Sequence, residues 1–208
     1  MLTIVNLFVY SVLMAASRRE QILSTAADLF AARGFHGVSV ADLGAACGIS
    51  GPALYRHFPS KDAMLAEMLV SISEELLEVG RERVRESEDA REALHALTNW
   101  HIDFALNNKP LIVVQDRDWS SLPGEARERV RDLQRRYVEL WVDQLRAIHR
   151  GLQGNQARAM AHAAFGLLNS TPHSALLSAA QMRATLERMA LAALLAPPDG
   201  SGSRPASS

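Results

Sequence analysis

The 208-residue chain carries 22 Lys and Arg against 23 Asp and Glu, a formal charge of −1, and 48% of its residues are hydrophobic. This length is enough for a sizeable core in one or two domains, and the composition excludes an intrinsically disordered chain. The charge balance excludes a protein that is basic along its whole length, although residues 17–61 hold five basic against three acidic side chains. The single cysteine, Cys47, excludes an intrachain disulfide and fits the reducing cytoplasm.

The first sixteen residues are uncharged and mostly apolar. A signal peptide needs a positive segment ahead of its apolar run, and this run is too short for a membrane span. Two interpretations remain: translation starts at Met14, or residues 1–16 form a flexible arm. At the other end, residues 197–208 are rich in Pro, Gly and Ser and are predicted to be a disordered tail.

Apolar residues recur at helical spacing along nearly the whole chain, and no strand-like alternation persists, so the predicted fold class is all-α. A first helix presents Ile22, Ala26, Leu29 and Phe30 on one face and ends before Gly34. Further helices are predicted from residue 61 to 80 or beyond, and at 89–107, 110–120, 125–150, 155–170 and 178–196. We therefore expect a three-helix unit at 17–63, followed by a larger helical bundle at 64–196.

Residues 39–61 carry the most information about function. Ser39 is a good cap for a short helix that Gly48 ends, and a second short helix begins at Ser50 or Gly51. Pro52 is acceptable there because the first turn of a helix does not use its N–H group. Two short helices joined by a turn that contains Gly are typical of a helix-turn-helix, whose second helix enters the major groove of DNA.

The string Ser39-Val40 … Ile49-Ser50 … Leu54-Tyr55-Arg56-His57-Phe58-Pro59-Ser60-Lys61 resembles the signature of TetR-type transcriptional regulators. The resemblance covers about residues 17–65, including Phe30, Gly34 and Phe35, and beyond about residue 70 it is only architectural. It implies a homodimer that binds a palindromic operator in double-stranded DNA and releases it when a small molecule enters the second domain. We expect a repressor that uses helix 51–57 to read DNA.

Within this stretch, Leu54 and Phe58 are expected to anchor the second short helix. The side chains expected to contact DNA phosphates are Ser39, Ser50, Tyr55, His57 and Lys61. The residues expected to contact the bases are Gly51, Pro52, Ala53 and Arg56. Gly51 and Ala53 are shorter than the polar residues often found there, which leaves thymine methyl groups and guanine as the bases read. Each of three assignments has an alternative that stays open. In these alternatives Tyr55 is a half-buried aromatic instead of a phosphate contact, His57 is an ordinary surface histidine, and Arg56 contacts a phosphate instead of a base.

The second unit is expected to bind the effector and to form the dimer. Effector-pocket candidates are bundle-facing aromatic and histidine side chains, each of which is otherwise a core residue: Trp100, His101, Phe104, Trp119, Tyr137, Trp141, His162 and Phe165. Small and apolar residues of the last two helices are expected to pair across a two-fold axis, or else to form an internal core pair: Ala161, Ala164, Phe165, Leu168, Met182, Leu186, Met189 and Ala193. The expected effector is apolar or amphipathic, such as an acyl-CoA or lipid intermediate, or alternatively a drug-like xenobiotic.

The sequence lacks the motifs of the other protein classes that were considered, enzymes and metal-binding proteins. The chain has no Gly-x-Ser-x-Gly elbow, no phosphate-binding glycine loop, no cysteine cluster and no His-Glu-x-x-His pair, so no enzyme, cofactor or metal site is predicted. A membrane protein would depend on residues 1–16 alone. Residues 115–118, Gln-Asp-Arg-Asp, form either a local charge network that couples the two units or a solvated helix face.

Overall fold

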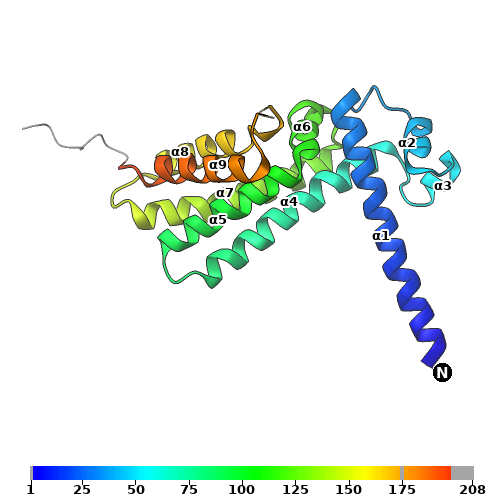
Figure 1. Cartoon of the computed structure of the whole chain (residues 1–208), viewed down its shortest axis with the longest axis horizontal. Coiled ribbons are helices and arrows are strands. Elements are labelled where there is room, and N and C mark those ends of the chain that lie inside the picture. Colours follow the sequence, from blue (N-terminus) through cyan, green and yellow to red (C-terminus); the bar gives the residue numbers. More distant parts are fainter. Residues whose placement is uncertain (1, 174–175, 198–208) are drawn as a thin grey trace, which may run out of the picture. The chain divides into compact units, whose positions relative to one another are not determined.

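The computed structural model describes residues 2–173 and 176–197, with side chains from Arg18 onward, so most of the predicted tail lies outside the described residues. Within that part, all regular structure is helical (Figure 1), which confirms the all-α class. The elements are α1 (Leu2–Arg33), α2 (Val40–Cys47), α3 (Gly51–Tyr55), α4 (Lys61–Glu86), α5 (Ala90–Asn107), α6 (Lys109–Asp118), η1 (Trp119–Ser121), α7 (Gly124–Ile148), α8 (Gly154–Leu168), η2 (Thr171–His173) and α9 (Ala179–Leu195).

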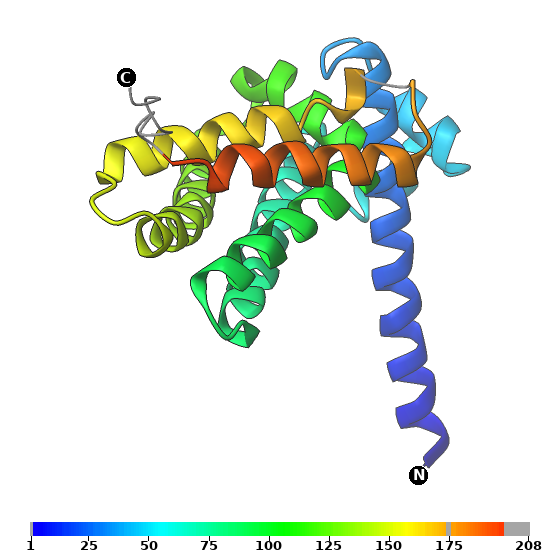
Figure 2. The same cartoon turned by 60° about the vertical axis from the view of Figure 1, so that its left-hand side comes forward.

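These elements form two compact units. The first contains residues 2–71 and 110–128, and the second contains residues 72–109 and 129–197. The first unit therefore extends past the expected boundary at residue 63 and includes α6, which the sequence placed in the second domain. Residues 2–16, which the sequence set apart, continue α1 as one helix in both views (Figures 1 and 2).

The first unit is built on the predicted inward face of α1. Ile22, Ala26 and Phe30 have no exposed surface, and the Phe35 ring meets the edge of the Phe30 ring at a centroid distance of 5.3 Å. Gly34 adopts a φ of 80°, the left-handed conformation that ends a helix and that glycine adopts without strain. The predicted end of the first helix is thus confirmed.

A charge network joins α6 to the end of α1 inside the first unit. Arg117 Nη1 donates to the carbonyl of Ala31 at 3.0 Å, and Nη2 donates to the carbonyl of Phe30. The same guanidinium pairs with the buried carboxylate of Asp118. Because the last carbonyls of a helix lack partners within the helix, Arg117 supplies the donors that the end of α1 requires.

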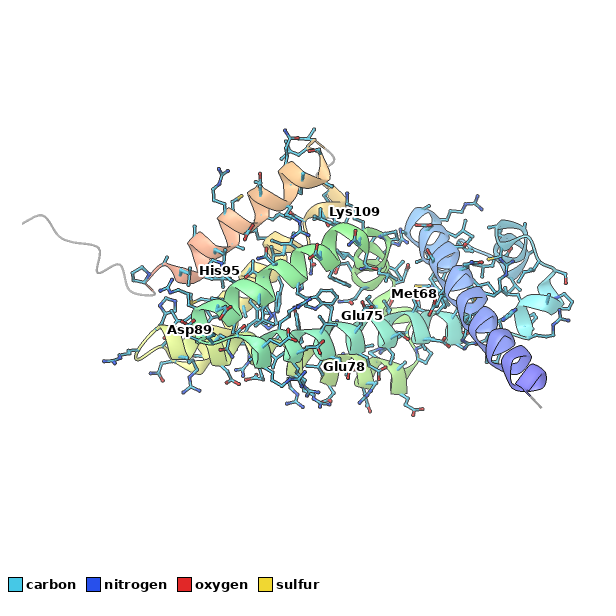
Figure 3. All side chains as sticks on the ribbon, turned by 60° about the horizontal axis from the view of Figure 1, so that its bottom comes forward. Met68, Glu75, Glu78, Asp89, His95 and Lys109 are labelled. Carbon is cyan, nitrogen blue, oxygen red and sulfur yellow. The ribbon has the colours of Figure 1, made fainter. Side chains whose placement is uncertain are left out.

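The second unit is a bundle of α5, α8, α9 and the larger parts of α4 and α7. Asp89 caps α5 by accepting hydrogen bonds from the backbone of Arg91 and Glu92, and Figure 3 shows it in the connection between α4 and α5. Gly80 on α4 lies against α7: a Cβ atom there would come within 2.7 Å of Cε2 of Tyr137. The two helices can approach this closely only because residue 80 has no side chain.

Candidate functional site

The helix-turn-helix of the first unit is formed by α2 and α3. Ser39 accepts a hydrogen bond from the backbone of Asp42 at 3.1 Å, and the Asp42 carboxylate accepts one from the backbone of Ser39, so the two residues form a capping box. These bonds from Ser39 hold the pKa of Asp42 below its usual value. Gly48 ends α2 with a φ of 65°, and Ser50 caps α3 by accepting from Ala53 at 3.3 Å.

Side chains of α3 and of the turn after it differ sharply in exposure. Leu54 and Phe58 are 2% and 1% exposed, which confirms that they anchor the helix, whereas Tyr55 is 53% exposed. Arg56 is exposed as well, and His57 is partly buried. The regular helix ends at Tyr55 rather than at residue 57, because Arg56 and His57 form the turn that follows it. The exposed side is the surface that a recognition helix offers to the major groove.

The remaining candidate base contacts lie at the start of α3. Pro52 is exposed, whereas Gly51 and Ala53 are partly exposed. None of the three carries a long polar side chain, so this end of the helix offers a small and largely apolar surface. Ser39 and Ser50 are both exposed, and their hydroxyl groups cap the starts of α2 and α3.

Lys61 has a second role that the sequence did not reveal. Its ammonium donates to the carbonyls of Phe35 at 2.7 Å and Val38 at 2.8 Å, and it lies 4.3 Å from the centre of the Phe35 ring. An ammonium has three N–H donors, so one remains after these two bonds. Lys61 therefore holds the connection between α1 and α2 and keeps one donor with which it can contact a phosphate.

Arg19 is a residue of the site that sequence reasoning missed. Its Nε donates to Glu67 at 2.7 Å, its Nη1 donates to the carbonyl of His57, and its guanidinium lies 4.0 Å from the centre of the Phe58 ring. The hydrogen bond to Glu67 raises the pKa of Arg19 above its usual value. Arg19, which lies on α1, thus connects the turn after α3 at His57 with Glu67 on α4. No local sequence pattern marks it, because its partners lie 38 and 48 residues away.

Five of the candidate effector residues form one aromatic cluster in the second unit. The His101 ring stacks on Phe165 and Tyr137, with centroids 4.9 and 5.8 Å away and planes 18° apart. The Phe104 and Trp141 rings lie 5.7 and 6.1 Å from His101. His101, Phe104, Tyr137 and Trp141 are buried, and Phe165 is the only member that is partly exposed.

The polar atoms of this cluster form a short chain. His101 Nε2 lies 3.1 Å from Oδ1 of Asn169, and Nδ1 lies 3.3 Å from the Tyr137 hydroxyl. Burial lowers the pKa of His101 to about 4 and raises the pKa of Tyr137, so both side chains are neutral at pH 7. The side-chain interaction of the Trp141 indole N–H with the Tyr137 hydroxyl opposes this rise in the pKa of Tyr137.

Three other pocket candidates lie outside this cluster or at its edge. Trp119 lies in η1 of the first unit, because residues 110–128 fold with that unit. His162 is exposed on α8 and meets only the edge of the Phe165 ring, 6.2 Å away. Trp100 is partly buried and donates to the carbonyl of Leu76 at 3.3 Å, so it joins α5 to α4. These two helices need that contact whether or not a ligand binds.

The predicted pairing surface needs a correction. Five of its eight residues are buried inside the single chain and cannot also face a partner: Ala161, Ala164, Leu168, Met182 and Leu186. Their apolar spacing serves the contact between α8 and α9 and the bundle beneath it, the internal alternative that the sequence left open. Phe165 belongs to the aromatic cluster. Met189, 48% exposed, and Ala193 remain on the outer side of α9.

Two other kinds of site are absent from the described residues. No group of three or more His, Cys, Asp or Glu side chains there is arranged to hold a metal ion. Within the same residues, no helix combines the length and the apolar character that crossing a membrane would require. The thiol of Cys47 is partly buried, and burial raises its pKa, which disfavours the reactive thiolate.

The geometry defines a helix-turn-helix protein with a separate helical domain, and comparison with known sequences agrees. Residues 22–68 match the family described as bacterial regulatory proteins, tetR family, and residues 87–173 match the tetracyclin repressor-like C-terminal domain. The chain belongs to the TetR family of transcriptional regulators. Membership confirms the predicted regulator and places the chain outside the enzymes.

Three relatives show how far the similarity extends. The HTH-type transcriptional repressor KstR2 of Rhodococcus jostii is 32% identical over 133 residues, which span 64% of this chain and only 65% of the repressor. The structure of the regulator PfmR from Thermus thermophilus is 27% identical, with a TM-score of 0.71 and coverage of 82% of this chain and 96% of that one. The structure of AibR with isovaleryl coenzyme A and operator DNA, 21% identical, has a TM-score of 0.64 and coverages of 83% and 97%, and it shows the shared fold.

Proposed function

We propose that this protein is a cytoplasmic, dimeric repressor that binds a palindromic operator and releases it when a small effector enters the second unit. The observation that carries the proposal is the arrangement of α3 and the turn after it: they bury Leu54 and Phe58 and expose Tyr55 and Arg56 beside two capped helix starts. A dimer follows from this role, because two recognition helices must reach half-sites about one turn of DNA apart.

The proposed DNA contacts divide into two kinds. Ser39, Ser50, Tyr55, His57 and Lys61 contact phosphates, which set the position of the protein but carry no sequence information. Bases are read by a small surface at the start of α3 and in the turn after it: Gly51, Pro52, Ala53 and Arg56. Apolar contact favours thymine methyl groups, and the Arg56 guanidinium matches the acceptors of guanine.

The proposed effector is apolar or amphipathic. The aromatic cluster of His101, Phe104, Tyr137, Trp141 and Phe165 offers it an apolar environment with few polar groups, as ligand pockets commonly do. Because AibR binds isovaleryl coenzyme A, an acyl-CoA is the first class to test, and a drug-like xenobiotic is the second.

Selection of bound DNA from a random library by the purified protein tests the proposal. We expect enrichment of a palindrome with two half-sites about one helical turn apart, and loss of binding when one metabolite fraction is added. Failure to enrich any site would overturn the DNA-binding role. An enriched palindrome that no metabolite or xenobiotic fraction releases would overturn the effector role alone.

The proposed dimer uses the outer sides of α8 and α9, which lie side by side in Figures 1 and 2. Small exposed residues there allow two helix pairs to approach closely: Ala159, Ala163, Gly166, Ala184, Ala192 and Ala193. His162, Met189, Arg158 and Arg188 are exposed on the same two helices. We expect Met189→Glu to raise the dimer dissociation constant about tenfold or more, because pairing would bury an unpaired carboxylate. Sedimentation velocity measures this. The control Leu176→Glu changes another exposed side chain, 94% exposed, and should leave the dimer intact.

Replacement of Lys61 by Met should weaken binding to every operator and reduce the dependence of log affinity on log salt by about one phosphate contact. The carbonyls of Phe35 and Val38 lose their donor as well, so the free energy of unfolding should fall by about 1–3 kcal/mol. Binding titrations at several salt concentrations and urea unfolding measure the two effects. Lys109→Met, which changes the only other lysine, is the matched control. A lower stability with an unchanged salt slope would leave Lys61 a purely structural role.

A further inference from the structure

Arg19 makes more contacts than an ordinary surface ion pair. Its Nε and Nη2 groups donate to the two carboxylate oxygens of Glu67, with Nε 2.7 Å from Oε1, so the two side chains meet as a fork of two bonds. Such a fork fixes the plane of the guanidinium. The same guanidinium donates through Nη1 to the carbonyl of His57 and lies 4.0 Å from the centre of the Phe58 ring. Arg19 therefore uses donors of all three of its nitrogen atoms inside the first unit.

The helix that this contact holds is too short to set its own direction. α3 has five residues, whereas an isolated helix of fewer than about 12 residues is marginal in water. Its direction is therefore set by the contacts at its two ends. At the start, Ser50 caps α3 and joins it to the turn from α2. At the other end, Phe58 is buried and the Arg19 guanidinium binds the carbonyl of His57, so the loss of Arg19 would release that end.

The charge of Arg19 is already balanced in the free protein. Glu67 forms the ion pair with it, and the two side chains are 37% and 32% exposed. A phosphate that bound the guanidinium in place of Glu67 would leave this carboxylate beside a second negative charge, which is unfavourable. Lys61, in contrast, donates to two uncharged carbonyl groups and keeps its positive charge for a phosphate. Arg19 is thus placed to orient α3 and not to add a phosphate contact.

We propose that Arg19 is a positioning residue for operator reading: aligned by Glu67, its guanidinium fixes the end of α3 and so the direction in which α3 meets the bases, without touching DNA. This inference rests on the DNA-binding role proposed above and adds a residue on which the choice of operator depends. Because the effect passes through the orientation of α3, it belongs to specific binding, which needs aligned base contacts. Binding to other DNA depends on phosphate contacts and tolerates a shifted helix.

Fluorescence-anisotropy titrations with two duplexes of equal length, the selected palindrome and a shuffled version of it, test this. We expect Arg19→Met to weaken binding to the palindrome about tenfold and to leave binding to the shuffled duplex within about twofold, with an unchanged dependence of log affinity on log salt. Arg19→Lys keeps the charge but cannot form the fork, so it should behave like Arg19→Met. The double variant Arg19→Met/Glu67→Gln keeps the net charge of the pair and should lose no more than Arg19→Met alone.

Hydrogen–deuterium exchange of the free protein reports on α3 without DNA. Backbone amides of residues 51–58 should exchange about tenfold faster in Arg19→Met, whereas those of α5 in the second unit should be unchanged. Arg129→Met is the matched control, because Arg129 also pairs with a glutamate of α4, Glu74 at 2.8 Å, but within the second unit. It should change neither the DNA titrations nor the exchange of residues 51–58.

The proposal is overturned if Arg19→Met weakens binding to both duplexes by the same factor, since Arg19 would then only support the fold. It is also overturned if the salt dependence falls by about one phosphate contact, because Arg19 would then touch DNA, or if the exchange of residues 51–58 is unchanged. An unchanged protein that prefers neither duplex would end the proposed function and this inference with it. A preference for the palindrome that persists in Arg19→Met would end this inference alone.

Discussion

Replacement of Gly44 by Ala should abolish most operator binding, although it adds a residue with a better helix propensity. Gly44 lies inside α2, where Ala would ordinarily be about 1 kcal/mol more favourable than Gly. A Cβ atom at this position, however, would come within 2.8 Å of the Ile49 carbonyl oxygen and 3.4 Å of the Gly51 nitrogen. Both are backbone atoms of the turn into α3, so they cannot move without moving the recognition helix.

The steric cost should exceed the gain in propensity. Crowding of this kind typically costs about 1–3 kcal/mol, which we expect as a net loss in the free energy of unfolding. Loss of even one base contact costs about 1–3 kcal/mol, and a displaced α3 changes several contacts together, so operator affinity should fall by about tenfold or more. Urea unfolding and a DNA titration measure the two quantities.

Gly124→Ala is the control for this experiment, because nothing lies within 4 Å of the added Cβ and the residue has no positive φ. It should leave stability and DNA binding close to those of the unchanged protein. If Gly44→Ala were instead more stable and bound DNA normally, the close approach of α2 to the turn would be wrong. The pair therefore separates the effect of crowding from that of removing a glycine.

The sequence predicted the features of this region that depend on neighbours along the chain. Ser39, Gly48 and Ser50 mark helix ends through local hydrogen bonds and backbone conformation, and the structure confirms each of them. The spacing of Leu54 and Phe58 likewise identified the buried side of α3. The close approach at Gly44 was not predicted, since it depends on how the turn folds back on α2 rather than on any residue pattern.

The predictions that the structure corrects all depend on contacts between segments far apart in the sequence. The apolar spacing of α8 and α9 fits an internal pair and a dimer equally well, and only the packed chain shows that Ala164, Met182 and Leu186 face inward. Trp119 was assigned to the bundle as part of the predicted helix 110–120, yet residues 110–128 fold with the first unit. Asn169 escaped notice for the same reason: its partner His101 is 68 residues away.

Protonation of His101 should destabilise the folded protein as the pH falls from about 6.5 to about 4. Burial lowers the pKa of His101 from 6.5 to about 4, so in this range the unfolded chain binds a proton that the folded protein does not. Stability therefore falls as the pH falls, by about 1.4 kcal/mol for each pH unit crossed in this range, or about 3 kcal/mol in total. Above pH 6.5 both states are neutral at this residue, and the contribution disappears.

Urea unfolding of the unchanged protein and of His101→Gln at pH 7, 6, 5 and 4.5 measures this contribution. The variant should be less stable at pH 7, because Tyr137 and Asn169 lose their partner, but its stability should depend much less on pH across this range. His95→Gln, on the same helix and partly exposed (Figure 3), keeps His101 and should keep the slope. Asp42 and Asp132 do not contribute to this pH dependence. Hydrogen bonds from Ser39 and Arg135 lower the pKa values of these carboxylates, so the stability that they contribute is lost only below about pH 4. Equal slopes in all three proteins would mean that the His101 ring is solvated in the folded protein, and the neutral aromatic cluster would lose its central member.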